Sequence, residues 1–325
     1  MFDRMKLVAA FAGVLALTVT ASAQTKWNLP SAYPNDNPHV ENLNAFAKDV
    51  AAATGGKLQI AVHGGASLFK GPEIKRAVAS GQAQAGESLI SIYENEDPIY
   101  GIDSVPFLAT SFPQAMKLWL AAKPLTEKKM AAQGMLVLFT VPWGPQGIYT
   151  KKELNTIDDM KGLKWRAYNV GTARIGALVG AQAVTVQAAE LPQALATGVV
   201  NAFMSSGATG YDSKVWETLT HFYDTRAWIP RNVTYVNKAA FDALDKPTQE
   251  AVLKAAKVAE ERGWKVWETK TEWYHEEIAK KGMKVLKPSK ALEDGFKKVG
   301  EQLTADWLKK AGAEGQQVVD AYKKM

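Results

Sequence analysis

Arg166 is the residue whose type and position point most directly to chemistry. It lies between apolar neighbours near the end of the segment 163–167, which is predicted to form a strand. In an open α/β sheet, ligands gather beyond the carboxyl ends of the strands. A guanidinium at such a place can donate two parallel hydrogen bonds to a carboxylate. The pattern agrees equally well with a surface arginine that pairs with Asp158 or Asp159.

Motifs for covalent, nucleotide or metal chemistry are absent from the sequence. There is no Gly-x-Ser-x-Gly elbow, no phosphate-cradling glycine loop and no His-Glu-x-x-His. Zero cysteines exclude cysteine nucleophiles and cysteine-rich zinc sites. The histidines are scattered, so we expect packing or surface roles for His39, His63, His221 and His275. We therefore expect no enzyme, no metal and no cofactor.

Aromatic side chains occur at several places that can face a cleft. Aromatic walls with a few polar anchors suit ligands with an apolar body and one charged end. The alternative for each of these residues is ordinary core packing. The aromatic candidates are Tyr33, Tyr93, Trp143, Tyr168 and Trp228. Glu87 and Ser88 are polar candidates near the end of another expected strand.

The elements that position these residues are expected to alternate between strand and helix. The expected strands are 27–32, 58–63, 83–92, 135–141, 148–150, 163–167, 183–186 and 199–204. The expected helices are 39–54, 71–80, 114–133, 171–179 and 190–197. This rhythm predicts an α/β fold with a largely parallel sheet. The Pro-Trp-Gly-Pro cluster at 142–145 predicts a crossing between two domains, and 226–237 would return the chain to the first.

One helix is expected to be unusually long. Pro247 is suited to a first helical turn, and the helical pattern runs on to about Lys281. Such a helix would be about 50 Å long at ~1.5 Å per residue, enough to brace two lobes along one side. The alternative is two shorter helices with a kink near 264–267.

The first 23 residues predict export. Arg4 and Lys6 precede an apolar run, and Ala21-Ser22-Ala23 supplies the small residues that signal peptidase requires. The run is shorter than the ~20 residues that span a bilayer, so we expect cleavage after Ala23 and a periplasmic protein. The net charge of +6 becomes +5 without residues 1–23. It forms no basic aromatic patch, so we expect no nucleic-acid partner.

Several short segments occur together in order along the mature chain. They are Thr54-Gly55-Gly56-Lys57, Ser67-Leu68, Val78-Ala79-Ser80-Gly81, Pro106-Phe107-Leu108, the Asp-Asp-Met-Lys-Gly-Leu-Lys-Trp-Arg segment 158–166, Gly180-Ala181, and the Thr-Gly-Val-Val-Asn-Ala end of 194–202. With these segments behind a signal peptide, the chain resembles the DctP-type solute-binding subunits of tripartite ATP-independent periplasmic (TRAP) transporters. The resemblance implies a periplasmic-binding-protein-like α/β fold with a central cleft, in which 24–143 plus 233–270 form one domain and 144–232 plus 271–325 the other.

The resemblance also implies site residues. Arg166 stands where the family has the arginine that binds the substrate carboxylate. A second family position, often arginine, corresponds to Gln146, and a neutral amide there favours a monocarboxylate over a dicarboxylate. Ser206, with Ser205 beside it, falls near the family's polar ligand-contacting position. The family's tyrosine after Glu-Leu is Pro192 here, so the identity of the ligand stays open.

We therefore expect a binding protein that captures a small organic carboxylate. A monocarboxylate, including aromatic, hydroxy or keto acids, is favoured. As the resemblance implies, the partner is an ion-coupled TRAP permease in the membrane, and we expect the binding protein to be a monomer. Two alternatives remain at this stage: a sensory subunit that presents the ligand to a membrane receptor, and a secreted enzyme acting on a small acid.

Overall fold

The computed structural model describes residues 24–325, so the expected signal peptide, 1–23, lies outside the described residues. The strands are β1 Thr25–Pro30, β2 Leu58–His63, β3 Ala85–Leu89, β4 Met135–Pro142, β5 Gly147–Thr150, β6 Lys164–Ala167, β7 Gln182–Thr185, β8 Ala202–Ser205, β9 His221–Tyr223, β10 Arg231–Asn237 and β11 Lys284–Leu286. The α-helices are α1 Pro38–Ala53, α2 Gly71–Ala79, α3 Phe112–Ala132, α4 Val170–Leu178, α5 Leu191–Ala196, α6 Gly207–Asp212, α7 Lys238–Asp242, α8 Lys246–Lys280 and α9 Lys290–Lys323. Short 3-10 helices are η1 Ile90–Tyr93, η2 Pro98–Ser104, η3 Ile157–Met160, η4 Ala188–Glu190 and η5 Val215–Glu217.

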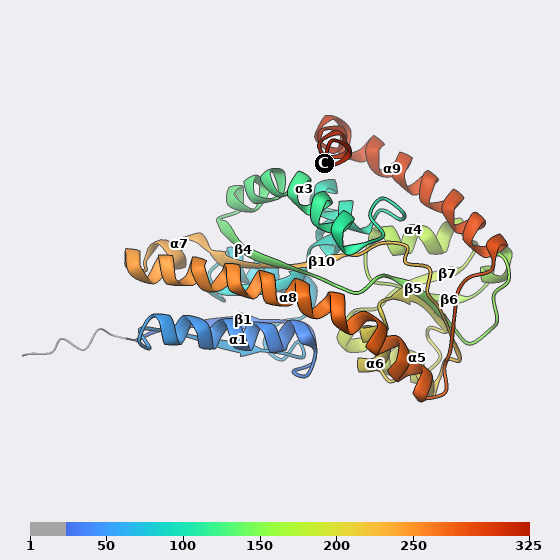
Figure 1. Ribbon diagram of the computed structural model, residues 1–325, viewed down its shortest axis with the longest axis horizontal. Coiled ribbons are helices and arrows are strands. Elements are labelled where there is room, and N and C mark those ends of the chain that lie inside the picture. Colours follow the sequence, from blue (N-terminus) through green and yellow to red (C-terminus); the bar gives the residue numbers. More distant parts are fainter. Residues whose placement is uncertain (1–23) are drawn as a thin grey trace, which may run out of the picture.

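The strands form two lobes, which we call the first and the second. In the first lobe, β1 pairs with β2, β1 lies beside β3, and the ladder continues in the order β3-β10-β4. In the second lobe, the order is β11-β9-β5-β8-β6-β7. The alternation of strands and helices therefore predicts the α/β class correctly, and Figure 1 shows the two lobes side by side.

The expectation of largely parallel sheets is wrong for two strands. β10 is antiparallel to both β3 and β4, and β5 is antiparallel to both β8 and β9. These are the two strands that follow the crossings from one lobe to the other. Each one enters its sheet from the side of the neighbouring lobe, so it runs against the strands that the local helices connect. The other pairings are parallel.

α8 is one continuous helix of 35 residues, and the alternative of two kinked helices is wrong. Asp245 caps its first turn by accepting a hydrogen bond from the Thr248 amide at 2.8 Å. Its buried residues recur every three or four positions, which gives one apolar face. This face packs on α1 and β4 in the first lobe and on α6 and β11 in the second. In Figure 1, α8 runs diagonally from α7 at the left to α5 at the lower right, and so lies alongside elements of both lobes.

The C-terminal helix α9 also reaches both lobes. Leu292 and Phe296 are buried in the core of the second lobe. Farther along, Trp307 and Val318 pack with Leu118 of α3 in the first lobe. The helix bends at Gly312, whose φ of 55° lies in the left-handed region. Among residues 24–325, no helix is long and apolar enough to cross a membrane.

Candidate functional site

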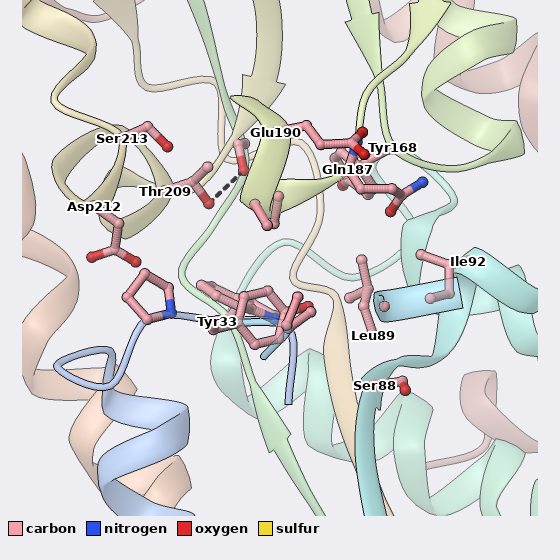
Figure 2. Close-up of a pocket in the computed structure, with 18 of the residues that line it drawn as sticks. Tyr33, Ser88, Leu89, Ile92, Tyr168, Gln187, Glu190, Thr209, Asp212 and Ser213 are labelled. Atoms are coloured by element: carbon pink, nitrogen blue, oxygen red, sulfur yellow. Dashed lines mark hydrogen bonds between the residues drawn. The ribbon is translucent and has the colours of Figure 1, made fainter. Parts of the chain in front are cut away.

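A cavity of about 290 Å³ lies between the lobes, at the carboxyl ends of several strands. Its size is at the lower end of the ~300–1,000 Å³ typical of ligand pockets, so it fits a small molecule. Its lining comes from the ends of β1, β3, β6 and β8, from the crossing after β4, and from the turn after β7. Figure 2 shows Tyr33 and Leu89 of the first lobe facing Thr209 and Glu190 of the second across this space.

Arg166 is the cation at the centre of the site. It is 3% exposed, and its Nε donates to the Val186 carbonyl at 2.8 Å, which fixes the plane of the guanidinium. Its Cζ lies 4.9 Å from the ring centre of Tyr168. Neither Nη atom has a hydrogen-bond partner among residues 24–325. The two Nη groups therefore stay available for an anion in the cavity.

Burial lowers the pKa of Arg166 to about 10. The side chain is still charged at neutral pH, and no carboxylate of the described residues forms an ion pair with it. The alternative of a surface pair with Asp158 or Asp159 is wrong, because Asp158 binds Lys161 and Asp159 caps the turn at Thr156. An uncompensated buried cation is expensive, and an incoming carboxylate would relieve that cost.

Gln146 lines the same cavity as Arg166, and its amide is oriented by hydrogen bonds to two neighbours. Its Nε2 donates to the Gly144 carbonyl at 2.9 Å, and its Oε1 accepts from the Tyr168 hydroxyl at 3.2 Å. One amide hydrogen stays free for a ligand. The site thus presents one charged donor, Arg166, and one neutral donor, Gln146, close to the same aromatic ring.

Tyr33 and Trp143 form an aromatic wall on the side of the first lobe. Their ring centres are 4.8 Å apart, edge to face, and both residues line the cavity. On the side of the second lobe, the Ser205 hydroxyl donates to the Thr209 hydroxyl at 2.8 Å, drawn as the dashed line in Figure 2. Apolar rings and hydroxyls therefore surround the two donors.

Six of the ten residues proposed from the sequence line this cavity, namely Arg166, Gln146, Ser205, Trp143, Tyr33 and Tyr168. Ser88, which the strand-end argument also named, lines it as well. The remaining four, Ser206, Glu87, Tyr93 and Trp228, do not.

Each of those four side chains is buried behind the wall or in a core. Ser206 caps α6 by accepting from the Thr209 amide. Glu87 bonds Ser31 and Asn232 beneath the wall. Tyr93 donates to the Gly71 carbonyl, and Trp228 packs in the core of the second lobe.

Several lining residues were missed by the sequence argument. The larger ones are Lys70, Leu89, Ile92, Gln187, Glu190, Thr209, Asp212, Ser213 and Pro230. Thr209 and Asp212 belong to α6, which starts directly after β8, so the strand-end rule could have included them. Lys70 and Glu190 meet across the cavity, with Nζ and Oε1 3.6 Å apart, and both are exposed. No sequence signal pairs them.

Asp212 forms a hydrogen bond between the lobes. Its Oδ2 accepts from Nδ2 of Asn37, in the loop before α1, at 2.7 Å. Burial raises the pKa of Asp212 to about 6, and the Asn37 bond only partly offsets that. The folded protein therefore binds a proton near pH 5 that the unfolded chain does not. The stability from this group is complete below pH ~4 and is lost as the pH rises through about 6.

We expect Asp212→Asn to be more stable than the wild type at pH 7.5, with a difference that shrinks towards pH 4.5. The asparagine can still accept from Asn37, but it cannot ionise. Thermal unfolding of both proteins from pH 4.5 to 8 measures the difference. A stability difference that does not change with pH would contradict the raised pKa of Asp212.

The comparison with family models assigns the chain. The model described as "Bacterial extracellular solute-binding protein, family 7", DctP, matches residues 31–310. The chain belongs to this family. The resemblance to DctP-type TRAP receptors is thereby confirmed, and so is the two-domain α/β fold. Family 7 receptors are extracytoplasmic proteins that bind small acids and work with membrane permease components.

Three solved structures of such receptors are similar to this family 7 protein over nearly its whole length. DctP6 of Bordetella pertussis, an extracytoplasmic solute receptor binding pyroglutamic acid, is 55% identical, with a TM-score of 0.91 over 93% of this chain and 100% of that chain. A marine metagenome TRAP protein specific for pyroglutamate is 46% identical, with a TM-score of 0.92 over 93% and 100%. DctP7 of B. pertussis, also binding pyroglutamic acid, is 43% identical, with a TM-score of 0.91 over 92% and 99%.

Proposed function

We propose that this protein captures pyroglutamate, a small cyclic monocarboxylate, for a TRAP permease. The observation that carries the proposal is the buried Arg166 guanidinium, whose Nη groups face a small cavity without a carboxylate partner among the described residues. A single buried cation suits one carboxylate. The choice of pyroglutamate is supported by the three similar receptors. They are 43–55% identical to this chain, and each of them binds pyroglutamate.

The proposed pose follows from the donors and the rings. The ligand carboxylate accepts from the two Nη groups of Arg166. The five-membered ring lies against Trp143 and Tyr33, which provide apolar surface. The lactam carbonyl accepts the free amide hydrogen of Gln146 or the hydroxyl of Thr209. Each oxygen of pyroglutamate then has a donor of the right kind.

The proposal includes a mechanism without a catalytic step. The two lobes, 24–143 plus 233–270 and 144–232 plus 271–325, close on the ligand, which stabilises the closed state by its higher affinity for it. The exported chain is cleaved after Ala23, acts as a monomer in the periplasm, and delivers the ligand to the permease. Arg166 comes from the second lobe and the Tyr33 wall from the first, so one ligand contacts both.

Thermal unfolding of residues 24–325 with a panel of acids tests this function. The panel comprises L-pyroglutamate, L-proline, L-glutamate, pyruvate, a sugar acid and succinate. We expect pyroglutamate to raise the unfolding temperature more than the other acids do. A ligand at ~100 times its dissociation constant adds ~2.7 kcal/mol to the free energy of unfolding, so the acid that binds most tightly gives the largest rise. Proline keeps the ring and carboxylate but adds a positive charge, so it is the closest control. A folded protein that responds equally to all of them, or to none, would contradict the proposal.

A further inference from the structure

Beneath the aromatic wall lies a chain of buried polar groups that does not touch the cavity. Asn232 of β10 is 1% exposed. Its Oδ1 accepts from Trp143 Nε1 at 2.8 Å and from the Tyr33 hydroxyl at 3.4 Å. Its Nδ2 donates to Oε1 of Glu87 at 2.7 Å. One amide therefore holds the polar ends of both aromatic residues that line the first-lobe side of the cavity.

Glu87 of β3 is in turn held from the other side. It is 2% exposed, and its Oε2 accepts from the Ser31 hydroxyl at 2.7 Å. Its Oε1 also lies 3.2 Å from Nδ1 of His39, a close contact that is not a hydrogen bond. The His39 ring packs on Trp143, with ring centres 4.2 Å apart. The carboxylate thus fixes Asn232, and it also contacts the histidine that packs on the back of the same indole.

A carboxylate buried without lysine or arginine is a costly way to fill a core. An apolar residue at 87 would pack β3 against β10 without that cost. What an apolar residue cannot do is orient Asn232, because the amide would lose its acceptor. The direction of the Asn232 amide determines whether its oxygen faces Trp143 and Tyr33. The free-energy cost of burying the Glu87 carboxylate is therefore linked to the orientation of Trp143 and Tyr33.

We infer that Glu87 and Asn232 are positioning residues: Glu87 fixes the Asn232 amide, and Asn232 fixes Trp143 and Tyr33 in the orientation that receives the ligand. A wall that is already in place removes the cost of ordering it when the ligand arrives. The inference rests on the proposed function only for the choice of pyroglutamate as the probe.

The test exchanges the amide of Asn232 and the carboxylate of Glu87 between the two positions. Asn232→Asp places two carboxylates in contact, and they cannot both ionise without repulsion. Asn232→Asp combined with Glu87→Gln restores one amide and one carboxylate in reversed order. In this double variant the introduced glutamine donates, and the introduced aspartate accepts from it and from Trp143 and Tyr33. Asn28→Asp, the same substitution at an exposed position of β1, is the matched control.

Titration with pyroglutamate between pH 6 and 8.5 reads the result. We expect the affinity of Asn232→Asp to fall about tenfold as the second carboxylate ionises. The double variant should return to within about threefold of the wild type and lose the added pH dependence. The titratable groups that face Glu87 are His39, Tyr33 and Tyr235, all present in every variant, so the wild-type profile corrects for them. A double variant as weak as the single one would overturn the inference.

A second readout needs no ligand. The Trp143 indole N–H resonance of the free protein, assigned with Trp143→Phe, should shift with pH in Asn232→Asp but not in the wild type or the double variant. If the wild type fails to bind pyroglutamate, the proposed function is wrong while this resonance still tests the positioning role. An indole signal that ignores pH in all three proteins would overturn it. If Asn232→Asp unfolds at high pH and the double variant does not, that rescue supports the same pairing.

Discussion

Arg166→Ala is expected to weaken pyroglutamate binding by at least about a hundredfold, because truncating one partner of a buried charge pair costs ~2–5 kcal/mol. The ligand carboxylate would enter the cavity and lose the two Nη donors that face it. The affinity of Arg166→Lys for pyroglutamate should lie between those of the wild type and Arg166→Ala, since an ammonium keeps the charge but cannot donate two parallel hydrogen bonds. Isothermal titration measures all three proteins.

Arg174→Ala is the matched control for that loss. Arg174 is an exposed arginine of α4 whose guanidinium pairs with Asp306 at 3.2 Å. Removing it should leave the affinity unchanged, because exposed pairs contribute little and this one is not part of the cavity. Equal binding by Arg166→Ala and the wild type would show that Arg166 serves only the fold.

The ligand-free protein should respond to Arg166→Ala in the opposite direction. Burial lowers the pKa of Arg166, which means that folding disfavours its charged form. The free variant is therefore expected to unfold at the same temperature as the wild type or at a higher one. A variant that binds worse but is at least as stable would separate a binding role from a structural one.

Gln146→Arg is expected to shift the ratio of succinate to pyroglutamate affinity by at least about tenfold towards succinate. A second guanidinium beside Arg166 would pair with a second carboxylate, and each tenfold step is worth ~1.4 kcal/mol. Pyroglutamate brings only one negative charge, so it would leave two cations close together partly unbalanced. Parallel titrations with both acids measure the ratio.

Gln146→Met separates the new charge from the lost amide. Methionine has a similar length but cannot donate to Gly144 or accept from Tyr168, so it removes the hydrogen bonds of Gln146 without adding a charge. This variant should lower the affinity for both succinate and pyroglutamate, and pyroglutamate should still bind more tightly than succinate. If Gln146→Arg and Gln146→Met give the same ratio, the neutral amide does not set the preference for a monocarboxylate.

Much of the site could be predicted because parallel strands bring their carboxyl ends together. Ser205 is far from Arg166 and Tyr168 in the chain, but all three lie at the ends of the neighbouring strands β6 and β8. The long helix α8 could be predicted from a helical pattern that runs to about Lys281 and from Pro247 in its first turn. These features depend on local patterns that the sequence displays directly.

The residues that failed to reach the cavity show where such reasoning stops. Ser88 lines the cavity while Glu87 does not, and Ser205 lines it while Ser206 does not. Successive side chains of a strand point to opposite faces, so an error of one residue reverses the assignment. The antiparallel direction of β5 and β10 depends on how the chain crosses between lobes, and the sequence carries no local signal for that.

A crystal structure of residues 24–325 grown with L-pyroglutamate tests the central claim most directly. We predict the ligand in the cavity between the lobes, with its carboxylate within hydrogen-bond distance of both Nη atoms of Arg166 and its ring against Trp143 and Tyr33. A pyroglutamate carboxylate bound away from Arg166, or a cavity that stays free of the acid at saturating concentration, would contradict it.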